Sequence, residues 1–235
     1  MPSGRAFTTL PCGHRALFLT ETPSTNAEAM TLALEGAEPP LWVWAGRQTK
    51  GRGRLGRDWD SPEGNLYASL LLRPHCPPQA IGGLPLVAGL AARGAIAALT
   101  GEALADRLRL KWPNDIMLEG AKLGGVLIES VVLSAGGRAV VIGTGLNLAS
   151  APSGLGRAVT SLREHGFAVA PEQALAALAE ASARWLENWA NGAGFPQIRE
   201  AWLRHAVPLG APISVTLGGQ KVAGRFGGLD ETGAL

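Results

Sequence analysis

Residues 126–146 read VLIESVVLSAGGRAVVIGTGL, and they indicate the fold class more clearly than any other stretch of the sequence. Two runs rich in Val, Ile and Leu, 126–133 and 139–146, lie on either side of Ala135-Gly136-Gly137. Runs of this composition around a short glycine-containing turn predict a paired β-hairpin. Glu129 lies in the first run, and we interpret it as a charge at the surface end of that strand.

Further strands and helices are predicted on both sides of this hairpin. Apolar runs at 15–20, 41–45, 66–72 and 108–112 are typical of strands, and Pro113 ends the last one. A helix is expected over 22–35, because Thr25 and Glu28 have the spacing of a capping box. Helical spacing of apolar residues predicts three more helices, over 84–99, over 175–189 and around 198–203. Clustered strands with flanking helices indicate an α+β fold with a mixed, mostly antiparallel sheet that carries its helices on one face.

The sequence changes character near residue 208, which suggests a domain boundary. Residues 1–207 are expected to form the large domain. Residues 208–235 are expected to form a small β unit whose two strands, 213–217 and 221–226, meet at Gly218-Gly219.

Composition and charge exclude several classes of protein. The 235 residues carry a formal net charge of +2, so a strong polyanion binder is not expected from overall charge. Cys12 and Cys76 are too few for a disulfide framework, and the scattered histidines do not suggest a metal site. The apolar run 80–92 is too short to span a bilayer. The beginning of the sequence lacks a signal-peptide pattern. Together these features predict a soluble cytoplasmic protein.

The segment Gln48-Thr-Lys-Gly-Arg-Gly-Arg-Leu-Gly-Arg-Asp-Trp59 combines cations with glycines. Glycine lets backbone N–H groups approach a ligand closely, and arginine offers forked donors that match phosphate and carboxylate. This pattern favours a loop that folds over an anion. A solvated loop, or a tether for nucleic acid, would have the same composition.

Three shorter segments carry further candidate residues. In Leu110-Lys-Trp-Pro-Asn-Asp-Ile116, Asn114 and Asp115 follow a strand end, where they could face a ligand or simply close a turn. Lys122 begins the segment Lys122-Leu-Gly-Gly125, where it could stabilise a carboxylate attacking a phosphate or lie at the surface. The run 142–148 contains Gly-Thr-Gly, which suggests close approach of a ligand. Because no helix is predicted after this Gly-Thr-Gly, it is not interpreted as a dinucleotide fingerprint.

Taken together, these segments resemble the biotin–protein ligases. The resemblance rests on Ser24-Thr-Asn26, the Gly/Arg loop with Gln48 and Trp59, Lys111-Trp-Pro-Asn-Asp115, Lys122-Leu-Gly-Gly125 and Gly143-Thr-Gly-Leu-Asn147. Each motif is weak alone, but all five occur in the family's order across about residues 20–165.

The resemblance implies a fold and a reaction. The fold would be the class II synthetase-like catalytic domain followed by an SH3-like barrel, for which 208–235 is too short. In the reaction, biotin and MgATP give biotinyl-5′-AMP, and a lysine of a biotin carboxyl carrier protein then accepts biotin. ATP, Mg²⁺ and biotin would be substrates, with no bound prosthetic group.

The resemblance also implies roles for individual residues, and it leaves the metal ligands unknown. Asp115 would help to position Mg²⁺ or the attacking lysine. The catalytic residues would be Lys122, Arg54 and Asp115. Biotin would be bound by Ser24, Thr25, Asn26, Gln48, Gly51, Arg52, Gly53, Arg54, Lys122 and Gly143. ATP and the adenylate would be bound by Arg52, Arg54, Arg57, Trp59, Asn114, Lys122, Gly145 and Asn147.

The resemblance leaves two rival functions open. One is a lipoate or octanoate ligase of the same fold, although the Gly/Arg loop and the Lys-Trp-Pro-Asn-Asp segment favour biotin. The other is a nucleic-acid-binding protein that uses residues 50–57 and whose affinity would fall steeply with salt. Because the catalytic segments begin within the first thirty residues, a DNA-binding domain and a repressor function are not expected. No membrane partner is expected, and the family includes homodimers.

Overall fold

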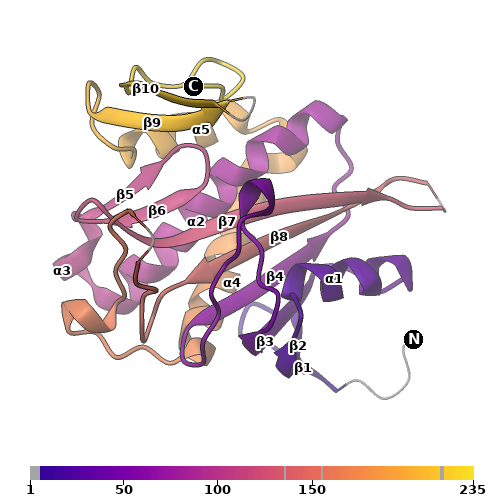
Figure 1. Ribbon diagram of the computed structural model, residues 1–235. Helices are drawn as coiled ribbons and strands as arrows, with labels where there is room; N and C mark the ends of the chain where they lie inside the picture. Colours follow the sequence, from indigo (N-terminus) through magenta and orange to yellow (C-terminus); the bar gives the residue numbers. More distant parts are fainter. Residues whose placement is uncertain (1–5, 135, 155, 218–219) are drawn as a thin grey trace.

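The computed structural model of this chain describes residues 6–134, 136–154, 156–217 and 220–235 (Figure 1). Its strands are β1 (Phe7–Thr9), β2 (Arg15–Thr22), β3 (Leu41–Gln48), β4 (Leu66–Leu72), β5 (Leu108–Lys111), β6 (Asp115–Leu118), β7 (Ala121–Val132), β8 (Arg138–Leu146), β9 (Pro212–Leu217) and β10 (Gln220–Arg225). Its α-helices are α1 (Thr25–Leu34), α2 (Leu84–Thr100), α3 (Glu102–Ala105), α4 (Pro171–Trp189) and α5 (Phe195–Arg204).

Within the described residues, β1 to β8 form one sheet in the order β1-β2-β3-β4-β8-β7-β6-β5. Strands β2 and β3 run parallel, and every other neighbouring pair is antiparallel. The expected mixed, mostly antiparallel sheet is therefore confirmed. Strands β7 and β8 form the predicted hairpin, but Ala135 of its turn lies outside the described residues.

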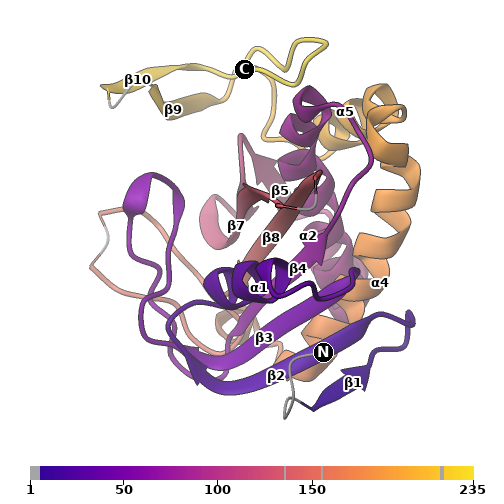
Figure 2. The same cartoon turned by 90° about the vertical axis from the view of Figure 1, so that its right-hand side faces the viewer.

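The helices cover both faces of the sheet, so the expectation of helices on one face is wrong. Helices α2, α4 and α5 pack together on the face that carries Val140 and Ile142 (Figures 1 and 2). Helix α1 packs on the opposite face, against Val43, Leu71 and Val141. Neighbouring residues of a strand point to opposite faces, so Val140 and Val141 belong to two separate cores.

Residues Pro78–Thr100, which include α2, are long and apolar enough to pass a composition test for a membrane-spanning helix. Most of this stretch is buried among α4, α5 and the sheet, as in the core helix of a globular domain.

The last part of the chain forms the hairpin β9–β10, which projects beyond the β5–β6 end of the sheet (Figure 2). Its predicted turn residues, Gly218 and Gly219, lie outside the described residues. Phe226 follows the hairpin and is 3% exposed, with its ring 6.3 Å from that of Trp202 in α5. The backbone oxygen of Gly233 accepts a hydrogen bond from Trp112 Nε1 (3.1 Å). These contacts attach 208–235 to the large domain; the division at residue 208 stays a prediction.

Candidate active site

A pocket with about 450 Å³ of empty space, part of it open to solvent, lies on the α1 face of the sheet. Residues from the start of α1, the end of β3, β7 and β8 converge there. Of the residues expected to bind biotin, the lining includes Ser24, Thr25, Asn26, Gln48, Arg52, Lys122 and Gly143. Gly51 lies behind this lining, and Gly53 and Arg54 lie in the neighbouring hollow.

Ser24, rather than Thr25, is the N-cap of α1. The Ser24 hydroxyl accepts from Ala27 N (3.5 Å), so the expected capping box of Thr25 and Glu28 is wrong. Thr25 instead uses its polar groups across the fold. Its backbone N donates to Gln48 Oε1 (2.9 Å), and its hydroxyl lies 2.8 Å from the Ser69 hydroxyl. The cap thus leaves Thr25 available to the pocket wall.

Gln48 and Asn26 are both held in fixed orientations. Gln48 Nε2 donates to Ser61 Oγ (3.0 Å), and Ser61 Oγ donates to Trp59 O (2.9 Å). The Ser69 hydroxyl donates to Asn26 Oδ1 (2.6 Å). Because each buried amide already has a partner, this wall is organised before any ligand arrives.

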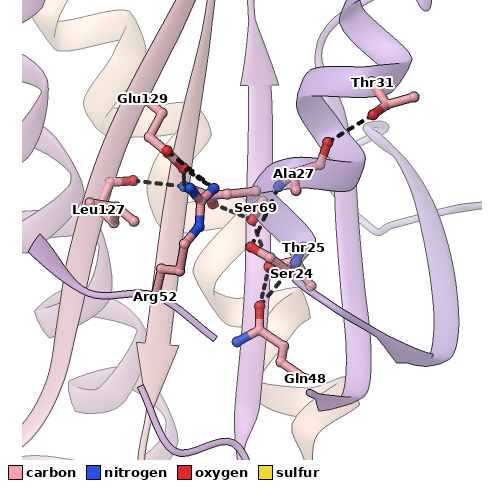
Figure 3. A network of polar contacts seen from close by, with 10 residues as sticks. Ser24, Thr25, Ala27, Thr31, Gln48, Arg52, Ser69, Leu127 and Glu129 are labelled. Carbon is pink, nitrogen blue, oxygen red and sulfur yellow. Dashed lines mark hydrogen bonds and ion pairs between the residues drawn. The ribbon is translucent and has the colours of Figure 1, made fainter. Parts of the chain in front are cut away.

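Glu129 belongs to this network, so its interpretation as a strand-end surface charge is wrong. It pairs with Val141 within the β7–β8 ladder, and its Oε2 accepts from Asn26 Nδ2 (2.8 Å). Arg52 Nη2 lies 3.2 Å from both carboxylate oxygens. Figure 3 shows Glu129 and Arg52 facing each other beside Ser24 and Thr25.

Glycines in the pocket wall allow close approach that a larger residue would prevent. A Cβ at Gly143 would lie 2.2 Å from Asn26 Oδ1, and one at Gly145 would lie 2.7 Å from the Trp59 ring. A Cβ at Gly51 would lie 2.3 Å from the Trp59 backbone oxygen. Gly51 therefore shapes the pocket without lining it.

A wider hollow, which we call the trough, adjoins the pocket and has about 2020 Å³ of empty space including its open mouth. The two hollows share Trp59, Asn114 and Lys122. The trough is rich in cations: its lining includes Arg54, Arg57, Lys111, Lys122 and Arg157, against the acidic Asp58 and Asp115. Ser214 and Val215 of β9 close one side. Such a charge balance suits a polyphosphate.

Lys122 lies at the junction of pocket and trough and is 8% exposed. Its ammonium donates to the Asp115 carboxylate and lies 5.2 Å from the centre of a Trp59 ring. Burial lowers the pKa of Lys122, while Asp115 acts in the opposite direction. Arg157 and Lys111 lower this pKa further. Because Lys122 lines both hollows, its ammonium is well placed to meet an anion from either side.

The Gly/Arg loop reaches across the trough. Arg54 Nη1 donates to Asn114 Oδ1 (3.3 Å), and the Asn114 amide donates to Val126 O (2.6 Å). Gly53 N donates to Arg57 O (2.7 Å), which closes the loop on itself. Arg54 and Arg57 are exposed, so the loop lies over the trough rather than inside the fold.

Asn147 is one predicted site residue that lines neither hollow. Its side chain donates to Thr160 O (3.1 Å), and its backbone N donates to Leu123 O (2.9 Å). The side-chain contact ties the segment after β8 to Thr160, and the backbone contact ties it to β7. A role of Asn147 in binding the adenylate stays a prediction.

Ser69, Ser61 and Tyr67 contribute to the pocket or its supporting network and were not predicted from the sequence. Ser69 and Tyr67 each place a hydroxyl in the otherwise apolar run Leu66–Leu72. Because a buried hydroxyl needs a partner, this pattern is a signal that could have identified both residues. Burial raises the pKa of Tyr67, which lines the pocket and donates to Pro62 O (2.8 Å). Across the part of the chain that the structure describes, no three or more His, Cys, Asp or Glu side chains come together as a group that could hold a metal ion.

Comparison with known proteins identifies relatives along most of the chain. The family model for the biotin/lipoate A/B protein ligase family matches residues 18–147. A biotin–[acetyl-CoA-carboxylase] ligase from Paracoccus denitrificans is 44% identical over 223 residues, which cover 92% of this chain and 91% of that protein.

Solved structures agree with these matches. A biotin protein ligase from Aquifex aeolicus in complex with biotin and ATP matches with a TM-score of 0.76 and 30% identity, over 93% of this chain and 89% of the other. The Leishmania major ligase in complex with biotinyl-5-AMP matches with a TM-score of 0.68 and 28% identity, over 86% and 90%.

Proposed function

Because this chain belongs to the biotin/lipoate A/B protein ligase family, we propose that it is a biotin–protein ligase that activates biotin with ATP and transfers it to a carboxylase. ATP, as its magnesium complex, and biotin are its substrates. Mg²⁺ would arrive with the nucleotide, since this ion commonly stays bound to water and substrate phosphates.

The observation that carries this proposal is the meeting of the two hollows at Lys122. In the first step, a biotin carboxylate oxygen attacks the α-phosphorus of ATP. A new P–O bond forms while the bond to the leaving pyrophosphate breaks. Carboxylate and phosphate repel each other, so the step needs cations where they meet. Lys122 would contact both groups, and Arg54 would cover them.

Asp115 would position the Lys122 ammonium through the hydrogen bond that it accepts. Arg52, Arg57 and Asn114 would bind the nucleotide phosphates, and Trp59 with Gly145 would form the wall between nucleotide and biotin. In the second step, the amine of a carrier lysine attacks the acyl carbon. The C–N bond forms, the C–O bond to AMP breaks, and the amine loses a proton.

The polar pocket wall favours biotin over lipoate. Thr25 and Gln48 offer hydrogen-bonding groups that match the ureido ring of biotin, and Asn26 lines the pocket beside them. The dithiolane ring of lipoate has no N–H or C=O to exchange with them. A ligand that leaves such groups unpaired is disfavoured by several orders of magnitude where a site is built around a polar group.

The acceptor would be the biotin carboxyl carrier domain of a carboxylase, since the Paracoccus denitrificans relative is named for acetyl-CoA carboxylase. The cytoplasmic location, the absence of DNA and membrane partners, and a homodimer stay predictions.

The test is transfer to a carrier domain. The purified chain, MgATP, biotin and a carrier domain should together give a carrier whose mass rises by one biotinyl group at its acceptor lysine. A carrier with that lysine changed to Arg is the control. A carrier that is lipoylated when lipoate is supplied, and not biotinylated with biotin, would show that the chain is a lipoate–protein ligase.

A further inference from the structure

Glu129 is a carboxylate that no step of the proposed reaction uses. It lies in β7 on the same face of the sheet as the pocket and accepts a hydrogen bond from Asn26 Nδ2 (2.8 Å). Its other partner is Arg52, 3.2 Å away. Its side chain is 29% exposed, so the contact is only partly screened by water. An ionised carboxylate accepts hydrogen bonds and donates none.

Because the Glu129 carboxylate can only accept hydrogen bonds, it fixes the orientation of the Asn26 side-chain amide. If the amide were turned over, Asn26 Oδ1 would face the Glu129 carboxylate, and two acceptors would repel each other. The Nδ2 group therefore faces Glu129 and the Leu127 carbonyl (3.4 Å), and Oδ1 faces Ser69 Oγ (2.6 Å). The positions of the oxygen and nitrogen in the Asn26 amide are thus assigned from their hydrogen-bond partners.

The Ser69 hydroxyl has one hydrogen, and Asn26 Oδ1 can only accept it. Thr25 Oγ1 lies 2.8 Å from Ser69 Oγ and 3.2 Å from Gln48 Oε1. With the Ser69 hydrogen committed to Asn26, the Thr25 hydroxyl donates to one of these two acceptors. In either case its hydrogen is used within the protein, and the Thr25 oxygen meets a ligand as an acceptor.

Gln48, in contrast to Thr25, presents a hydrogen-bond donor to the ligand. Its Oε1 accepts from Thr25 N (2.9 Å), so its Nε2 is the donor group. One of the two Nε2 hydrogens goes to Ser61 Oγ (3.0 Å), and the second remains for a ligand. The pocket therefore presents an acceptor at Thr25 and a donor at Gln48. A cyclic urea, with N–H groups beside a C=O group, is the complement of this pair.

We propose that Glu129 is a positioning residue that sets the direction of hydrogen bonding through Asn26 and Ser69 to Thr25, and so selects a ligand with a urea-like edge. This inference rests on the proposed function, because it names the group of biotin that the network recognises. Glu129 acts without touching the ligand. Figure 3 shows Glu129 set apart from Thr25, with Ser69 between them.

A rival account gives Glu129 no task except holding Arg52. Four variants separate the two accounts: Glu129→Gln, Glu129→Ala, Asn26→Asp and the double variant Asn26→Asp/Glu129→Gln. Both substitutions at Glu129 remove the ion pair with Arg52. Only Glu129→Gln keeps an oxygen that can accept from Asn26.

Isothermal titration with biotin is the measurement, and thermal unfolding of each variant shows whether it is folded. We expect Glu129→Ala to weaken biotin binding about tenfold or more, the effect of one misdirected buried hydrogen bond. Glu129→Gln should stay within about threefold of the wild type. Asn26→Asp should bind poorly, because it sets two carboxylates against each other.

The double variant gives the sharpest outcome. Its new amide at position 129 would donate to its new carboxylate at position 26, and that carboxylate would still accept from Ser69. Binding should therefore recover most of what Asn26→Asp loses. Equal weakening by Glu129→Gln and Glu129→Ala would overturn the proposal, as would a Glu129→Ala variant with wild-type affinity or a double variant without recovery. If the wild type itself does not bind biotin, the proposed function fails. If the wild type binds biotin but the variants do not behave as expected, only the role of Glu129 fails.

Discussion

The Lys122 ammonium donates to the Asp115 carboxylate at the point where the pocket and the trough meet. The two residues come from neighbouring strands, Asp115 from the start of β6 and Lys122 from the start of β7. The hydrogen bond to Asp115 fixes the position of the Lys122 ammonium, which is the cation that the proposed first step needs. It also makes the charge of Lys122 depend on Asp115.

We therefore predict a change in pH dependence for Asp115→Asn. Burial lowers the pKa of Lys122 and Asp115 raises it, so removal of the Asp115 charge lowers this pKa further. Lys122 is charged only below its pKa, so the alkaline decline of activity should move to lower pH. The rate of ATP–pyrophosphate exchange, measured as a function of pH, locates this alkaline decline in the wild type and in Asp115→Asn. Asp106→Asn, remote from Lys122, is the control, and a decline that moves upward or not at all would contradict the assignment.

We predict that Arg54→Gly releases the reactive adenylate. Arg54 reaches Asn114 across the trough (3.3 Å), and one lost charged contact should speed escape about tenfold. Escaped biotinyl-AMP would acylate lysines of bystander proteins, which a streptavidin blot of an added protein detects. Arg47→Gly removes an arginine that is 56% exposed and bound to Glu21, and it should leave bystanders unlabelled. An active Arg54→Gly enzyme without bystander labelling would disprove the role of this loop.

We predict that Gly143→Ala weakens biotin binding about tenfold or more. Its Cβ would lie 2.2 Å from Asn26 Oδ1, so Asn26 must move away from Ser69. Gly82→Ala is the matched control, because nothing lies within 4 Å of a Cβ there. Titration with biotin measures both variants, and equal affinities would mean that Asn26 does not shape the pocket.

The sequence predicted most of this framework because the relevant signals are local. The run Leu66–Leu72 and the spacing of apolar residues in α2 each identify an element without reference to the rest of the chain. The five motifs also predicted most of the pocket lining. Thr25 shows why local rules fail. Thr25 and Glu28 have the spacing of a capping box, but Ser24 is the N-cap. The polar groups of Thr25 instead contact Ser69, 44 residues away, and Gln48, 23 residues away.

The role of Glu129 and the lining of the trough could be recognised only from the three-dimensional fold. A glutamate within a strand faces either side, and only the pairing of β7 with β8 puts this one beside Asn26. Similarly, the contribution of Ser214 and Val215 to the trough depends on how the last hairpin sits over β5 and β6. No local pattern contains that information.

We predict that Phe226 stabilises the attachment of residues 208–235. Replacing a buried Phe with Ala costs about 3–5 kcal/mol, and Phe226 is 3% exposed against α5. Urea unfolding of Phe226→Ala should show a loss of this size, and the KM for ATP should rise because β9 borders the trough. Val222→Ala, 46% exposed in β10, should change stability by about 0.5 kcal/mol or less. Unchanged stability in Phe226→Ala would contradict this account.

Biotin-dependent ATP–pyrophosphate exchange tests the central claim most directly, because it requires only the first step and no acceptor protein. The purified chain should exchange label between pyrophosphate and ATP when biotin is present, and should show only background exchange with lipoate or without an acid. Lys122→Met should reduce the biotin-dependent rate by about a hundredfold or more, the loss typical of a group that stabilises developing charge. Exchange that depends on lipoate, or biotin-dependent exchange that survives Lys122→Met, would contradict the account.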